Sequence, residues 1–152
     1  MKVRHLYISP GHNFFGHHGV AAGEHPIAAV HQIECVAGRG IQGDRFFDFK
    51  RDYKGQITFF ALEVFNELSE ALAIKNLAPA VLRRNVITEG VDLNTLVGHD
   101  FELQGLTFRG MTECAPCYWM DGAFGPGAEH FLQGRGGLRA QILDGGTLRV
   151  ES

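Results

Sequence analysis

The sequence predicts a mainly β protein, a β-barrel with a few short helices on its outside. Many short segments with strand-like alternation follow one another at close spacing, and only one segment has a clear helical period. Strands and helices do not alternate in the way that builds a parallel sheet, which also favours a barrel. The 152 residues are 45% hydrophobic and 20% charged, so we expect one folded domain over residues 1–152, including a Gly- and His-rich loop at about residues 9–26.

The N-terminal half contains three predicted strands and the main helix. Alternation of apolar and polar residues predicts strands over 2–9 and 30–37, on either side of the loop SPGHNFFGHHGVAAGEHP. An apolar strand is expected over 56–60, after a stretch rich in glycine, aromatic and charged residues. Leucine and phenylalanine recur at spacings of three and four over 61–73, which predicts an amphipathic helix.

The C-terminal half is predicted to form short strands and two hairpins. A strand is expected over 85–88 and a helical turn over 92–97. Strands over 101–103 and 106–111 flank Gln-Gly, and strands over 139–143 and 147–150 flank Asp-Gly-Gly, so each pair is expected to form a hairpin. A short helix is expected over 128–132.

Charge, apolar runs and cysteines exclude several classes of function. The net charge is −3 and no Lys-rich run exists, which argues against a general nucleic-acid-binding protein. No apolar run approaches the roughly 20 residues of a membrane-spanning helix, and the N-terminus lacks the apolar centre of a secretory signal. Three cysteines, an odd number, favour a reducing compartment, so we expect a cytoplasmic protein.

Arginine next to glycine or asparagine is the first pattern that indicates a binding site. Ten of the 14 basic residues are arginine, and three segments combine it with such neighbours: residues 38–45, 83–85 and 134–139. Glycine lets a ligand approach the backbone, and the guanidinium group binds anions through two donors, so these segments predict an anion site; turns with solvated arginines are the alternative. Asp44 is expected either to orient Arg45 or Arg84 or to form an ordinary ion pair. The candidate residues are Gly43, Asp44, Arg45, Arg84, Asn85, Gly137 and Arg139.

Cysteine and histidine supply a second group of candidates. Cys114-Ala115-Pro116-Cys117 is typical of redox chemistry or of half a zinc site, and a thiolate near arginines also binds a soft metal. Cys35 lies on the apolar side of a predicted strand and is expected to be a packed thiol. The loop histidines, His12, His17, His18 and His25, are either metal ligands or ordinary polar loop residues. We expect His17 or His18 to lie close to the ligand.

Four segments in order carry a resemblance to a known family: GIQGDR, RRNVITEGVDLNTLVG, CAPCYWM and GRGGLRAQIL. Together they resemble the MOSC domain, named for the C-terminal part of molybdenum cofactor sulfurases. The resemblance extends from about Val30 to Val150, and the preceding segment SPGHNFFGHHG is similar to a small stand-alone subfamily.

The resemblance implies both a fold and a ligand. The implied fold is a β-barrel related to the β-barrel domain of pyruvate kinase. The implied ligand is molybdenum cofactor (Mo-molybdopterin), an anionic pterin dithiolene that carries a phosphate. By the same resemblance, Cys117 corresponds to the catalytic thiolate that ligates the metal, and Arg45, Arg84 and Arg139 correspond to the family's basic positions.

The implied function is an oxidoreductase or a sulfur-carrier component, since relatives include sulfurases and reductases of N-hydroxylated bases. Two alternatives stay open: a non-catalytic module that stores or delivers the cofactor, and a small zinc protein that uses His12, His17 or His18 with Cys117. Pyridoxal phosphate is not expected, because the chain has no room for a desulfurase domain. A separate redox or sulfur-donor protein is the expected partner, and neither nucleic acid nor a membrane is.

Overall fold

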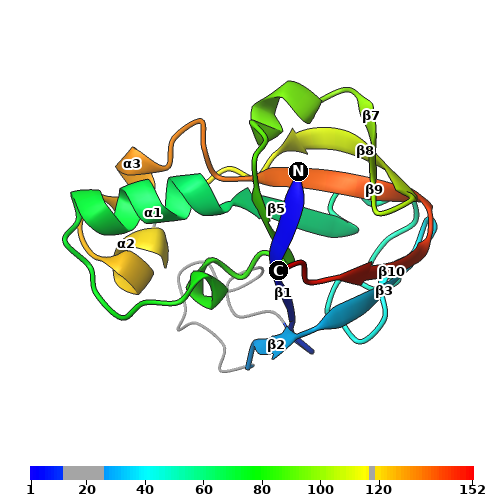
Figure 1. The fold of residues 1–152 in the computed structure, drawn as a ribbon, viewed down its shortest axis with the longest axis horizontal. Helices are drawn as coiled ribbons and strands as arrows, with labels where there is room; N and C mark the ends of the chain where they lie inside the picture. The colour runs from blue at the N-terminus through cyan, green and yellow to red at the C-terminus, as the bar shows by residue number, and fades with distance from the viewer. Residues whose placement is uncertain (12–25, 117–118) are drawn as a thin grey trace.

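The chain folds into two β-sheets with short helices, which confirms the mainly β prediction (Figure 1). A computed structural model describes residues 1–11, 26–116 and 119–152. The larger sheet has seven strands in the order β2-β1-β6-β5-β9-β8-β7, and the smaller has three in the order β10-β3-β4. Among the strands in the described residues, β5 and β6 run parallel to each other and the other paired strands are antiparallel.

The elements have the following bounds. The larger sheet contains β1 (Lys2–Ile8), β2 (Ala28–Val30), β5 (Ile57–Ala61), β6 (Val86–Glu89), β7 (Asp100–Leu103), β8 (Leu106–Glu113) and β9 (Leu138–Asp144). The smaller sheet contains β3 (Gln32–Val36), β4 (Gly40–Ile41) and β10 (Gly146–Arg149). The helices are α1 (Leu62–Ala71), α2 (Trp119–Phe124), α3 (Ala128–Phe131) and the 3₁₀ turns η1 (Pro79–Leu82) and η2 (Leu93–Leu96).

The closed barrel is not found among the described residues. The larger sheet has open edges at β2 and β7, which pair with no further strand there, and the smaller sheet is separate from it. The three α-helices lie together on one side of the larger sheet (Figure 1). The relation to the pyruvate kinase barrel is therefore not confirmed. Within the same part of the chain, no helix is both long and apolar enough to cross a membrane.

One predicted hairpin is confirmed and the other is wrong. Leu103 pairs with Leu106, and Gln104 and Gly105 both have positive φ (52° and 81°), as the tightest hairpin turn requires. In contrast, β10 pairs with β3 and not with β9. The reason is that the chain crosses to the smaller sheet at Gly145, whose backbone lies so close to the Cys35 carbonyl that an added Cβ would be 2.4 Å from that oxygen.

Two apolar clusters hold the elements together. The first is built from strands of both sheets, with the rings of Phe59 and Phe108 edge-to-face at 5.5 Å, and it includes the packed thiol predicted at Cys35. Burial and the charge of Glu34 raise the pKa of Cys35 to about 12, so this cysteine is inert. The second cluster lies between the larger sheet and the helices, and Phe65 and Leu68 of α1 are buried in it.

Candidate functional site

A row of polar side chains crosses the larger sheet on its helix-covered face. Arg139 of β9 is directly opposite Thr58 of β5 on one side and Thr112 of β8 on the other. Residues directly opposite each other point to the same face of a sheet. The neighbouring residues Phe59 and Leu138 belong to the first apolar cluster, so the row points away from that cluster.

Asn85 completes this row at the start of β6. Its Oδ1 accepts hydrogen bonds from the backbone N–H (3.0 Å) and the hydroxyl (3.1 Å) of Thr58, and its Nδ2 donates to the Tyr7 carbonyl at 3.2 Å. The side chain is 2% exposed, and these bonds engage both ends of its amide. Asn85 therefore joins β1, β5 and β6 and fixes the backbone next to Arg84.

Arg84 points toward the segment before β9. Its Nε donates to the Gly136 carbonyl at 3.2 Å and its Nη1 to the Leu82 carbonyl at 3.0 Å. Gly136 in turn packs on Cys114, since a Cβ at Gly136 would be 1.9 Å from the Cys114 carbonyl oxygen. Among the described residues Arg84 has no carboxylate partner, so its charge is not neutralised by an ion pair there.

Asp44 folds back on Arg45, one of the arrangements that the sequence allows. The Asp44 carboxylate is buried; its Oδ1 accepts from Arg45 Nη1 at 3.1 Å and from the Ser9 N–H at 3.0 Å. Arg45 Nη2 donates to the Arg83 carbonyl at 2.9 Å, and the Arg45 side chain is only 8% exposed. Arg45 is thus held by protein groups on two sides.

Arg83 belongs to the predicted segment 83–85 but is not among the candidate residues. It has φ 55°, and its Nη2 donates to Ser9 Oγ (2.8 Å) and to the Gly11 carbonyl (2.9 Å). Burial and the charge of Arg45, partly offset by Asp44, lower the pKa of Arg83 to about 10. Burial also lowers the pKa of Arg45, and Arg84 contributes to this by charge repulsion. The Arg45 and Arg83 guanidinium groups stay protonated at neutral pH.

Arg139 is connected to the other arginines through Tyr53. Burial raises the pKa of Tyr53, and the positive charges of Arg139 and Arg45 partly oppose this. Both guanidinium groups therefore lie within electrostatic range of one phenol. Arg45, Arg83, Arg84 and Arg139, here called the arginine cluster, come together from segments far apart in the sequence. Asp44 forms an ion pair with Arg45 of this cluster.

The two candidate glycines have structural roles at the edge of the cluster. Gly137 has φ +105°, and a Cβ there would be 2.3 Å from the Phe59 carbonyl oxygen. Gly43 has φ +84° in the turn after β4, and its Cβ would meet Ile8 at an ordinary 3.6 Å. Gly137 is thus required for close packing, and Gly43 for the direction of the chain that leads into Asp44.

The cysteine and histidine candidates are only partly covered by the described residues. Cys114 is 2% exposed and its N–H donates to the Gly137 carbonyl at 2.8 Å, which places it beside the arginine cluster. Cys117, His17 and His18 lie outside the described residues, as do His12 and His25. Within residues 1–11, 26–116 and 119–152, no group of three His, Cys, Asp or Glu side chains is placed to hold a metal.

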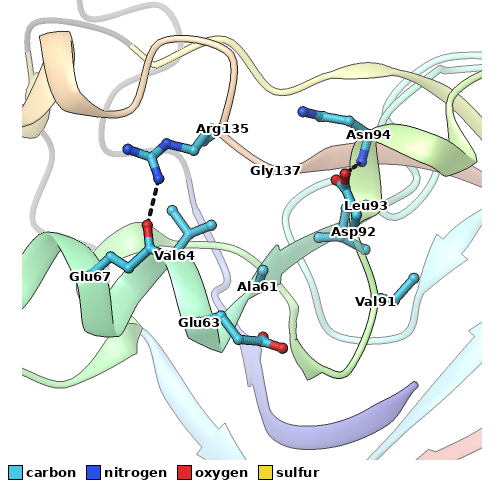
Figure 2. Close-up of a pocket in the computed structure, with 10 residues that line it drawn as sticks. All are labelled: Ala61, Glu63, Val64, Glu67, Val91, Asp92, Leu93, Asn94, Arg135 and Gly137. Atoms are coloured by element: carbon cyan, nitrogen blue, oxygen red, sulfur yellow. Dashed lines mark hydrogen bonds and ion pairs between the residues drawn. The ribbon is translucent and has the colours of Figure 1, made fainter.

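A pocket of about 420 Å³ lies partly against the segment 134–139, which also carries Arg139 of the arginine cluster (Figure 2). Arg135 forms a 2.6 Å ion pair with Glu67 of α1, and Glu63 Oε2 accepts from the Gly90 N–H at 2.8 Å. The carboxylates of Glu63 and Glu67 at this pocket therefore already have protein partners. This pocket, which was not predicted from the sequence, is formed by the start of α1, the loop after β6 and the segment before β9. It is lined by Ala61, Glu63, Val64, Glu67, Val91, Asp92, Leu93, Asn94, Arg135 and Gly137.

Comparison with known protein families shows to which family this chain belongs. The family model of the MOSC domain matches residues 21–152. The chain belongs to the MOSC domain family. This confirms the resemblance carried by the four sequence segments and extends the match to nearly the whole chain. Among curated proteins, none matches this MOSC sequence.

Solved structures share the fold of this MOSC protein at low sequence identity. YuaD from Bacillus subtilis is 20% identical with a TM-score of 0.73, and the match covers 98% of this chain and 91% of YuaD. YiiM from Escherichia coli is 15% identical with a TM-score of 0.63, covering 96% of this chain and 65% of YiiM. YiiM from Geobacillus stearothermophilus is 11% identical with a TM-score of 0.68, covering 97% and 70%. The chain spans about two thirds of the YiiM proteins.

Proposed function

We propose that this MOSC protein binds molybdenum cofactor, with the anionic part of the cofactor at the arginine cluster. The observation that carries the proposal is that Arg84 and Arg139 form no ion pair in the described part of the chain, while Asp44 is paired with Arg45. An anion with several oxygens matches this donor set, because guanidinium groups bind phosphate through two parallel hydrogen bonds.

Within the cluster the arginines divide into two roles. Arg45 and Arg83 are buried and bonded to protein oxygens, so they supply charge and hold the backbone. Arg84 and Arg139 are half-buried and form no ion pair in the described part of the chain, so they are the residues that we expect to contact the anion. Asn85 fixes the backbone next to Arg84, and Asp44 holds Arg45 in place. His17 or His18 is proposed to lie near the same ligand.

Cys117 is proposed as the thiolate that ligates the metal of the cofactor. It follows Cys114 by three residues, and Cys114 lies beside the arginine cluster through its contacts with Gly136 and Gly137. Positive charge favours a thiolate, and a thiolate suits a soft metal. When bound, the cofactor would supply a redox-active metal centre. The protein would then act as an oxidoreductase or a sulfur-carrier component with a separate redox or sulfur-donor protein, in the cytoplasm.

Metal and pterin analysis of the purified protein tests this proposal. Protein produced in a host that makes molybdenum cofactor is expected to contain molybdenum and pterin in equal amounts, and protein from a cofactor-deficient host neither. Stoichiometric zinc without molybdenum would contradict the proposal and support the zinc alternative. Turnover of an N-hydroxylated base with an artificial reductant would then separate an enzyme from a storage or delivery module.

Replacement of Arg139 should weaken anion binding without loss of fold. Arg139→Lys keeps the charge but loses the two-donor geometry, and we expect a loss of about 1 to 3 kcal/mol, or about 5- to 150-fold in affinity. Inorganic pyrophosphate is the probe, titrated calorimetrically. Arg149→Lys, at an exposed position on β10 in the other sheet, is the matched control and should bind as the unmodified protein does. Unchanged affinity in both variants would show that only net charge matters, and equal loss in both would show that the effect is not specific to Arg139.

A further inference from the structure

Tyr53 presents a hydroxyl group with no hydrogen-bond partner among the described residues, next to the arginine cluster. We infer that Tyr53 is a further ligand-binding residue, whose hydroxyl donates a hydrogen bond to the same anion that Arg139 binds. This inference rests on the proposed anion site and adds a neutral donor to it. In the sequence, nothing marks Tyr53 beyond its place in an aromatic and charged stretch.

An aromatic stack fixes the ring of Tyr53 relative to Arg45. The rings of Phe46 and Tyr53 are stacked at 5.4 Å with an interplanar angle of 21°, and the ring of Phe49 is 4.9 Å from that of Tyr53. The Arg45 guanidinium lies over the Phe46 ring at 4.9 Å. Since guanidinium groups and aromatic rings attract each other, this stack joins Tyr53 to a buried cation of the site.

The backbone next to Tyr53 is tied to the strand that carries Arg139. Gln141 Nε2 donates to the Asp52 carbonyl at 3.0 Å. Gln141 and Arg139 are two residues apart on β9 and therefore point to the same face of the sheet. Gly55 lets the tyrosine ring lie close to the chain, since a Cβ there would be 3.0 Å from the ring. The phenol is thus held from two sides on the face where Arg139 lies.

The environment keeps the phenol in its donating form. Burial raises the pKa of Tyr53, and the charge of Cys114 when ionised acts in the same direction, while Arg139 and Arg45 oppose it. Tyr53 is therefore a neutral donor at pH 7. Arg139 likewise donates no hydrogen bond to a protein acceptor in the part of the chain that the structure describes. A guanidinium and a phenol with unused donors suit an oxyanion with at least two accessible oxygens, such as a phosphate or a pyrophosphate group.

Tyr53→Phe is a sharp test because it removes the hydroxyl and retains the ring that stacks on Phe46 and Phe49. With inorganic pyrophosphate as probe, we expect about 3- to 20-fold weaker binding and an unchanged thermal midpoint. Tyr7→Phe is the control: Tyr7 is buried in the second apolar cluster, its hydroxyl bonds to the Ala80 backbone, and its loss should leave the affinity unchanged.

Arg139→Gln in the same experiment separates the inference from the proposed function. If Arg139→Gln loses affinity while Tyr53→Phe binds as the unmodified protein does, the role of Tyr53 is overturned and the anion site stands. If the unmodified protein does not bind pyrophosphate, or Arg139→Gln binds equally well, the proposed anion site fails and the inference fails with it. Weaker binding in both variants, with Tyr7→Phe unaffected, supports the assignment.

Discussion

Replacing Cys117 with serine is expected to abolish retention of molybdenum and pterin, whereas Cys114→Ser should retain most of both. A serine hydroxyl is a harder ligand and a far weaker acid than a thiol, so it does not replace a thiolate at a soft metal. Cys114 is 2% exposed, which leaves its sulfur little access to a ligand. The measurement is the cofactor content of the two variants, purified side by side.

The pair of variants also distinguishes a single thiolate from a dithiol. If Cys114→Ser is the empty variant, or if both variants are equally empty, the two cysteines act together and the proposed role of Cys117 is wrong. Urea unfolding of each variant serves as the control, because loss of cofactor through unfolding would appear there as loss of stability.

Gly137→Ala is expected to destabilise the protein by about 3 kcal/mol or more, or to prevent folding. Its φ of +105° is rarely adopted by residues with a side chain, and the new Cβ would be 2.3 Å from the Phe59 carbonyl oxygen, a backbone atom of the central strand β5. Neither the strand nor the segment before β9 can move without breaking their pairing. The free energy of unfolding in urea measures the effect.

Gly134→Ala is the matched control, three residues earlier in the same segment. Gly134 has φ +75°, but an added Cβ would meet no atom within 4 Å. The expected cost is therefore that of the backbone conformation alone, about 1 to 2 kcal/mol. Equal destabilisation by the two substitutions would show that the contact with β5 contributes nothing.

Local sequence signals predicted the strands and the main helix but not all of their partners. Gln104 and Gly105 form the turn between β7 and β8 through their own positive φ angles, so this hairpin could be predicted from the local sequence. The Asp-Gly-Gly turn looks equally suitable, yet β10 pairs with β3. That choice depends on how closely Gly145 approaches Cys35, a contact between distant residues that no local pattern contains.

The candidate site could be predicted only where its residues are marked by their immediate neighbours in the sequence. Arginine beside glycine or asparagine indicated Arg45, Arg84 and Arg139, which the fold brings together. Tyr53 could not be found in this way, because its place depends on which side of a loop faces the sheet. The sequence also could not show that the side-chain amide of Asn85 joins three strands, because only the register of the sheet reveals these hydrogen bonds.

The pairing of β10 with β3 has a consequence for how the protein folds. The smaller sheet joins residues 32–36 to residues 146–149, so this contact closes a very long loop of chain. Contacts between distant residues require a large loss of chain entropy before they contribute stability, and proteins dominated by them fold slowly. During synthesis, β3 has to wait for almost the entire chain behind it to leave the ribosome. Until then Ile33 and Cys35, which the finished fold buries, lack the strand that pairs with them.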